Sequence, residues 1–69
     1  MNNNLVIDIH EFDGCVSSFE SIASAVRFMS DIGYANISAM YSNDDTASAR
    51  LCEEYAVLRE SFFQEVKHV

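Results

Sequence analysis

The sequence predicts a small α+β domain in which a sheet of two or three strands carries two helices on one face, in the element order β(β)αβα. Two short stretches alternate apolar and polar residues, the period of a strand. Two longer stretches repeat apolar residues at helical spacing. The chain has 69 residues, of which 49% are apolar, enough for one small core. We therefore treat residues 1–69 as a single domain, with polar residues 1–4 expected to be frayed.

The first strand is predicted at Leu5–His10, where branched aliphatic residues alternate with polar ones. Asp13 and Gly14 follow and favour a two-residue type I′ turn, because glycine accepts positive φ and aspartate tolerates it. This turn would set Phe12 opposite Cys15 and start a short second strand.

The first helix is predicted over Phe19–Ile32, where apolar residues follow the i, i+3, i+4, i+7 pattern. Ser17–Glu20 has the spacing of a capping box, so the helix would begin directly after the second strand. Gly33 follows the last apolar position, and we expect it to end the helix in the left-handed αL conformation.

A third strand is predicted at Asn36–Ser42, followed by a group of helix-capping residues at Ser42–Thr46. The second helix is predicted from Thr46 to Lys67, with apolar residues at alternating spacings of four and three. At the helical rise, ~22 residues span about 33 Å. This helix is longer than the rest of so small a domain, so its last turns should overhang.

A three-stranded sheet would have the order 2-1-3, because this order places the most apolar strand in the centre. Both helices would cover one face and leave the other open. The open face is expected to carry Val6, Asp8, His10 and Met40, with Cys15 and Phe12 nearby. A partly apolar, uncovered sheet face is typical of a surface that associates with another molecule.

Potential metal ligands gather near the N-terminus, at Asp8, His10, Glu11, Asp13 and Cys15. Only Asp8 and His10 clearly share a strand face, whereas a divalent metal needs three or four convergent ligands. Cys15 is not expected opposite His10, and the two glycines fit no phosphate-binding loop. We therefore predict no metal, no cofactor, no catalytic residue and no enzyme activity.

Cys15 and Cys52 lack the CxxC spacing of metal or redox sites. We expect both to be free, buried thiols in a reducing compartment, since nothing in the sequence supports a disulfide. The N-terminal residues have neither the basic nor the apolar region of a signal peptide. Apolar runs are also far shorter than the ~20 residues that span a bilayer. These features predict a cytoplasmic protein.

The charge balance disfavours direct binding to nucleic acid, because eleven acidic residues face four basic ones and the net charge is −7. Many carboxylates fall on the second predicted helix or its cap. Phe62 and Phe63 are adjacent on that helix, about 100° apart, so one of them should be exposed. The predicted partner-binding residues are Asp44, Asp45, Glu53, Glu54, Glu60, Tyr41, Phe62 and Phe63.

These features predict a small acidic protein-binding module that is not an enzyme. Acidic groups would steer it to a protein partner with a basic surface, such as one that handles nucleic acid, and aromatic residues would anchor it. Its size and charge suit an inhibitor or accessory protein of the kind that viruses and mobile elements make. The alternative is a homodimeric structural or regulatory module whose acidity only confers solubility. No membrane partner is expected.

Overall fold

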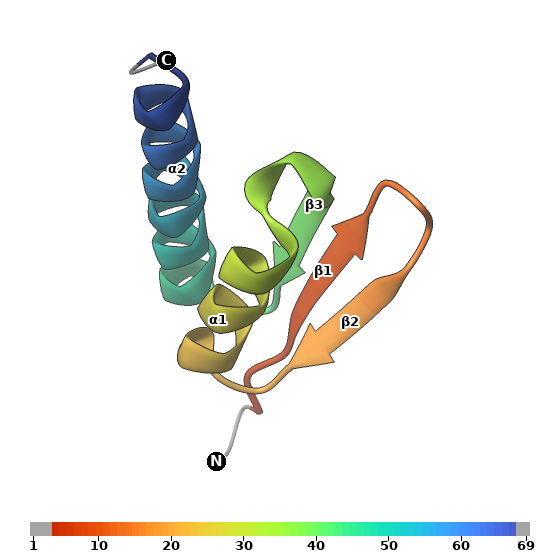
Figure 1. Cartoon of the computed structure of the whole chain (residues 1–69). Helices are drawn as coiled ribbons and strands as arrows, with labels where there is room; N and C mark the ends of the chain where they lie inside the picture. The colour runs from red at the N-terminus through yellow and green to blue at the C-terminus, as the bar shows by residue number, and fades with distance from the viewer. Residues whose placement is uncertain (1–3, 68–69) are drawn as a thin grey trace.

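The computed structural model describes residues 4–67, and the side chains of residues 4–61. Its elements in chain order are β1 (Ile7–Glu11), β2 (Val16–Phe19), α1 (Ile22–Ile32), the 3₁₀ turn η1 (Tyr34–Asn36), β3 (Ile37–Ser42) and α2 (Asp45–Lys67). The three strands form an antiparallel sheet in the order β2-β1-β3 (Figure 1). This confirms the predicted α+β class, the three-stranded order and the central place of the first strand.

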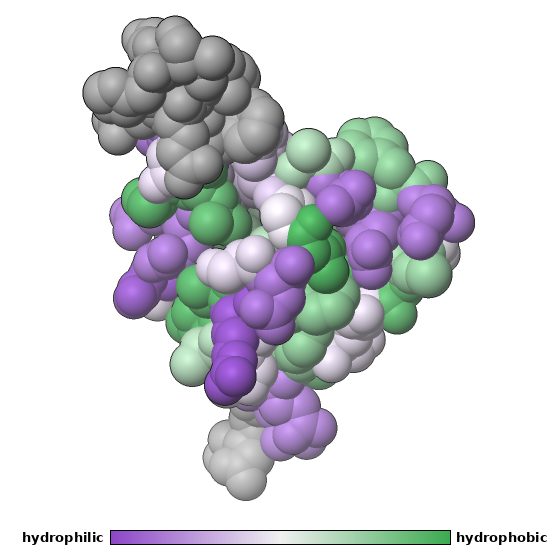
Figure 2. Space-filling model, viewed as in Figure 1, coloured by the Kyte–Doolittle hydropathy of each residue, from purple (hydrophilic) through white to green (hydrophobic). Residues whose placement is uncertain are grey.

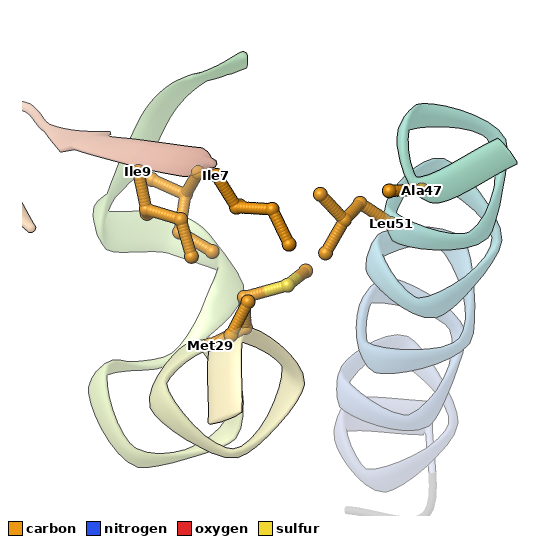
Figure 3. Close-up of a cluster of buried hydrophobic side chains, with 7 residues drawn as sticks. Ile7, Ile9, Met29, Ala47 and Leu51 are labelled. Carbon is orange, nitrogen blue, oxygen red and sulfur yellow. The ribbon is translucent and has the colours of Figure 1, made fainter. Parts of the chain in front are cut away.

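The core lies between the sheet and the two helices, which cover the same face of the sheet (Figure 1). Figure 3 shows the side chains of Ile7, Met29 and Leu51 pointing toward one another from β1, α1 and α2. Burying one such side chain contributes about 1.5–3 kcal/mol, so this cluster attaches the helices to the sheet. The core residues, each exposed by 5% or less, are Ile7, Ile9, Ala25, Met29, Ile37, Ala47 and Leu51.

Four residues, 12–15, separate β1 from β2, so the predicted two-residue turn is wrong. The Glu11 N–H donates to the Cys15 carbonyl at 2.9 Å, and the Gly14 N–H donates to the Glu11 carbonyl at 3.0 Å. A type I′ turn needs positive φ at both central residues. In residues 4–67 no residue other than glycine has positive φ, so Asp13 does not meet this requirement. Gly14, at φ +96°, is the third of the four loop residues instead of the second residue of a two-residue turn.

The longer loop shifts the pairing of β1 and β2 by one residue relative to the prediction. His10 lies opposite Val16, and Ile7 lies opposite Phe19. Because a shift of one residue exchanges the two faces of a strand, Phe19 comes to lie on the core side of the sheet. There it packs against the core, and its ring lies 5.0 Å from that of Phe28 in α1.

Helix α1 begins three residues later than predicted. Residues 17–19 pair with β1 as part of β2, so they are not available for a capping box. Ser21 caps the helix instead, because its hydroxyl accepts a hydrogen bond from the Ser24 N–H at 3.2 Å. The predicted capping box at Ser17–Glu20 is therefore wrong, although a serine does cap the helix.

Gly33 ends α1 as predicted, although not in the αL conformation. Its N–H donates to the Met29 carbonyl at 2.9 Å, and its backbone has φ +86° and ψ 143°. This extended conformation at positive φ is strained for residues with a side chain. A Cβ atom at Gly33 would meet nothing closer than Asn36 Nδ2 at 3.9 Å, so the conformation, and not the available space, requires glycine.

A β-bulge in β3 decides which of its residues face the core. Ile37 pairs with Glu11 and Ala39 pairs with His10, so Ser38 is an extra residue. Ile37 and Met40 therefore both pack on the core side, and Tyr41 faces away from it. The expectation that Met40 lies on the open face is wrong, because it assumed unbroken alternation along the strand.

The chain before β1 is attached to the turn that precedes α2. Asn43 Nδ2 donates to the Asn4 carbonyl at 2.7 Å, and the Val6 N–H donates to Asn43 Oδ1 at 3.0 Å. Asn4 is thus held in place, contrary to the expectation that it is frayed. The rest of that expectation, for residues 1–3, lies outside the described residues.

Helix α2 begins at Asp45, one residue before the predicted start. The Asp44 carboxylate caps it by accepting the Ala47 N–H at 2.9 Å. The helix runs past the sheet, as its length predicts (Figure 1), and the molecule measures 51 × 24 × 15 Å. Among residues 4–67, neither helix combines the length and apolarity needed to cross a membrane.

Candidate functional site

The face of the sheet opposite the helices is not covered by any described element, and we call it the open face. Val16 is 52% exposed and Tyr41 60% exposed there. On the side of the molecule seen in Figure 1, apolar residues reach the surface among hydrophilic ones (Figure 2). Strand by strand, the register gives the open face Val16 and Ser18 of β2, Asp8 and His10 of β1, and Ala39 and Tyr41 of β3, with Val6 at its border.

The centre of the open face is polar and ordered by contacts between strands. Asp8 on the central strand is half-buried, and its Oδ1 atom accepts a hydrogen bond from the Ser18 hydroxyl at 2.6 Å. On the other side Asp8 lies opposite Tyr41. The Tyr41 ring makes an edge contact with the His10 ring, with centroids 5.1 Å apart and planes at 84°. One carboxylate, two rings and flanking aliphatic groups are features of a recognition surface.

The hairpin loop next to the open face brings together Glu11, Asp13 and Cys15, whose potential ligand atoms lie within 4.8 Å of one another. The Cys15 N–H donates to Asp13 Oδ1 at 2.9 Å. This bond and a bond from the thiol lower the pKa of Asp13. The pKa of the Cys15 thiol is raised, because the thiol donates to the Asp13 carboxylate and because that charge opposes a thiolate. These contacts hold the loop in its conformation. We therefore assign Glu11, Asp13 and Cys15 a structural role in the hairpin loop.

Both cysteines are free, as predicted, but both are exposed, so the expectation of buried thiols is wrong. Cys15 lies at the end of the hairpin loop rather than within the paired strand. Cys52 follows the buried Leu51 on α2, and a step of about 100° along a helix carries it away from the core. A raised pKa at Cys15 is the opposite of what an activated nucleophile needs.

The structure divides the predicted partner-binding residues between different surfaces. Tyr41 lies on the open face, whereas α2 packs on the other face of the sheet. The backbone of residues 62 and 63 belongs to α2, but the side chains of Phe62 and Phe63 lie outside the described residues. The predicted acidic residues lie at the cap of α2 and along the helix: Asp44, Asp45, Glu53, Glu54 and Glu60.

Two of these acidic residues have partners within the chain. Asp44 caps α2, and Glu54 Oε2 accepts from Arg50 Nε at 3.2 Å, four residues apart on the helix. Glu53 and Glu60 are exposed on the same helix. Glu53, Glu54 and Glu60 contribute to the charge of α2, which packs on the face of the sheet opposite Tyr41, so they do not form one continuous site with it.

Sequence reasoning missed the parts of the open face that depend on strand register. Val16 and Ser18 were not predicted on this face because the pairing of β2 was placed one residue away. The contact of His10 with Tyr41 was not predicted because it depends on the bulge in β3. A glycine at position 14 suits both a two-residue turn and a longer loop, because both can use positive φ there. The local sequence therefore did not indicate the loop length.

In comparison with known proteins, no family model, no curated protein and no solved structure matches this chain. Its function is therefore argued from its own surfaces.

Proposed function

We propose that this chain is a non-enzymatic protein-binding module that docks on its partner through the open face. The observation that carries the proposal is the contrast between the two sides of the sheet. One side is covered by both helices, and the other exposes Val16, Tyr41 and, in the adjacent loop, Phe12, which is 74% exposed. Apolar and aromatic side chains grouped in this way favour association with another molecule.

The charge of the chain supports a partner with a basic surface. The net charge is −7, and the sequence holds no lysine or arginine between Asn4 and Ser21 or between Ile37 and Ala49. All three strands lie in these stretches. The strands and their loops therefore carry acidic side chains and no lysine or arginine. A basic partner surface would be attracted to this acidic chain, which accelerates association, whereas other acidic proteins would be repelled. Proteins that bind nucleic acid have basic surfaces. A module that occupies such a surface would inhibit the protein that carries it.

Site-specific photo-cross-linking tests the proposal, because the chain offers a matched pair of valines. Val16 on the open face is 52% exposed, and Val57 on α2 is 59% exposed. Each is replaced in turn by benzoylphenylalanine in the full chain, and each variant is expressed in the cells that naturally make it. We expect a distinct protein with a basic surface to be cross-linked from position 16 and not from position 57.

The contrary results are equally specific. Cross-linking from position 57 alone would place the interface on α2 and overturn the proposal. Cross-linking from position 16 only to a second copy of the chain would establish the homodimeric alternative instead. Sedimentation equilibrium of the purified chain would then have to show a dimer, whereas the proposal expects a monomer.

A further inference from the structure

We propose that Asp8 is the receptor for one arginine side chain of the partner, at the centre of the open face. The inference rests on the proposed function and names the chemical group that the surface recognises.

Asp8 occupies the middle of the open face in both directions. It lies on the central strand, with Ser18 directly opposite on one side and Tyr41 on the other. Side chains that face each other in this way have Cβ atoms about 5 Å apart. The hydrogen bond from Ser18 engages Oδ1 and fixes the orientation of the carboxylate. Ser18 is its one hydrogen-bond donor among the residues whose side chains are described, so Oδ2 is available to a ligand.

No cation in the described part of the chain is placed to neutralise Asp8. Arg27 belongs to α1, and Arg50 and Arg59 belong to α2, so all three are on helices that cover the other face. Arg50 also pairs with Glu54. A half-buried carboxylate without a cationic neighbour gains more from an external cation than a fully hydrated one does, because water screens it less.

The surroundings of Asp8 favour arginine over other cationic groups. A guanidinium is planar and can donate two parallel hydrogen bonds to a carboxylate. It also packs against aromatic rings, and Tyr41 and His10 provide rings next to Asp8 on the same face. Val6 and Val16 border the position with exposed apolar groups that suit the aliphatic part of an arginine side chain or its neighbours.

Two other occupants fit the same position less well. A divalent metal would find the Asp8 carboxylate, the His10 imidazole on the same face and a neighbouring hydroxyl, and only the first two are common ligands, which falls short of the three or four that it needs. A second copy of the chain would bring together two open faces that both contain Asp8 and two molecules of net charge −7. Like charges oppose that contact, so a basic segment of a different protein is the occupant that the charges favour.

The test uses the ¹⁵N-labelled full chain and two short peptides, acetyl-Leu-Arg-Leu-amide and the same peptide with citrulline in place of arginine. Citrulline keeps the shape of arginine but has no charge. We expect the arginine peptide, at millimolar concentration, to shift the amide signals of Asp8, His10, Ser18 and Tyr41. The citrulline peptide should bind about tenfold more weakly, which corresponds to ~1.4 kcal/mol.

Matched variants show whether Asp8 itself is responsible. Asp8→Asn keeps an oxygen that accepts from Ser18 and removes the charge, so it should weaken the arginine peptide about tenfold while the fold is retained. Asp31→Asn makes the same change at an exposed site on α1 and should leave binding unaltered. Tyr41→Leu should weaken binding, and Tyr41→Phe should not, because the ring supplies the contact.

The outcomes separate this inference from the proposed function. Equal binding of both peptides on the open face, or no effect of Asp8→Asn, would overturn the arginine position and leave the open face as the docking surface. Absence of any shift with the arginine peptide would also overturn the arginine position, while cross-linking from Val16 still tests the function. Shifts confined to α2 would contradict both.

Discussion

At the scale of single residues, Asp13 and Cys15 show how one loop can shift two pKa values in opposite directions. The Asp13 carboxylate accepts hydrogen bonds from the backbone and the thiol of Cys15, which lowers the pKa of Asp13 and raises that of Cys15. The lowered pKa means that the native loop favours the ionised carboxylate. This contribution to stability is present above the unfolded-state pKa of Asp13 and is lost as the pH falls through its lower folded-state value.

The same contact predicts that Cys15 reacts slowly despite its exposure. Only the thiolate is alkylated, and the Asp13 charge opposes its formation. In Asp13→Asn the charge is absent, so we expect iodoacetamide to modify Cys15 faster, with the pH midpoint of the reaction moved to a lower value. Peptide mass spectrometry over a pH series measures both. Cys52 in the same sample is the internal control, and an unchanged midpoint for Cys15 would contradict the assigned contact.

At the scale of elements, the start of α2 depends on a single side chain. The Asp44 carboxylate accepts a hydrogen bond from the Ala47 N–H at 2.9 Å, and the Asp44 N–H donates one to the Ser42 hydroxyl oxygen at 3.1 Å. This cap positions the first turns of α2, which contribute the buried Ala47 and Leu51 to the core. Loss of the cap therefore affects the packing of the helix on the sheet as well as the helix itself.

We expect Asp44→Ala to lower the free energy of unfolding by about 0.5–2 kcal/mol, the usual cost of removing a helix cap. Asp44→Asn keeps a capping oxygen and should cost much less, since asparagine caps helices as well as aspartate does. Urea unfolding followed by circular dichroism measures both variants. If the two lost equal stability, the charge of Asp44 and not its hydrogen bond to Ala47 would be responsible.

Most elements were predictable because their signals are local, whereas the errors in the helix start and in strand register depend on residues distant in sequence. The stripe of apolar residues in α1 and the capping cluster before α2 each identify a helix without reference to the rest of the chain. By contrast, Ser17 and Ser21 both suit a helix cap, and only the pairing of β2 with β1 assigns Ser17 to the strand. Similarly, no local signal marks the bulge at Ser38 that turns Met40 toward the core.

The candidate site was predictable in kind but not in detail. An open, partly apolar face and the presence of Asp8 and His10 on it follow from the alternation of β1, which the structure confirms. The neighbours that give Asp8 its chemistry, Ser18 and Tyr41, come from strands whose register depends on a loop length and a bulge. The predicted link between Tyr41 and the acidic α2 fails for the same reason, since the bulge places Tyr41 on the face that α2 does not cover.

At the scale of the whole molecule, the acidic residues of α2 are separated in space from the open face. The arginines Arg27, Arg50 and Arg59 all lie on the helices, on the far side of the sheet from the open face. Exposed acidic residues such as Glu53 and Glu60 also lie on α2. They can act on a partner at the open face through the electrostatic field of the molecule, but not through contact.

This separation predicts that the two groups of residues change different rate constants. Removal of two charges in Glu53→Gln/Glu60→Gln should slow association with the partner captured from position 16 and leave dissociation unchanged, because steering acts on encounter. Tyr41→Ala should accelerate dissociation and leave association nearly unchanged, because it removes a contact. Raising the salt concentration from low to near-molar should slow association of the original chain by about tenfold or more. Surface plasmon resonance with the purified partner gives both rate constants.

A neutral change on the same helix is the control for these kinetics. Val57 is exposed on α2 and lies between Glu53 and Glu60, so Val57→Ala alters that surface without altering its charge. Neither rate constant should change in this variant. If Glu53→Gln/Glu60→Gln accelerated dissociation as strongly as Tyr41→Ala does, α2 would be in contact with the partner. The bound molecule would then span both sides of the sheet, and the open face would be only part of the interface.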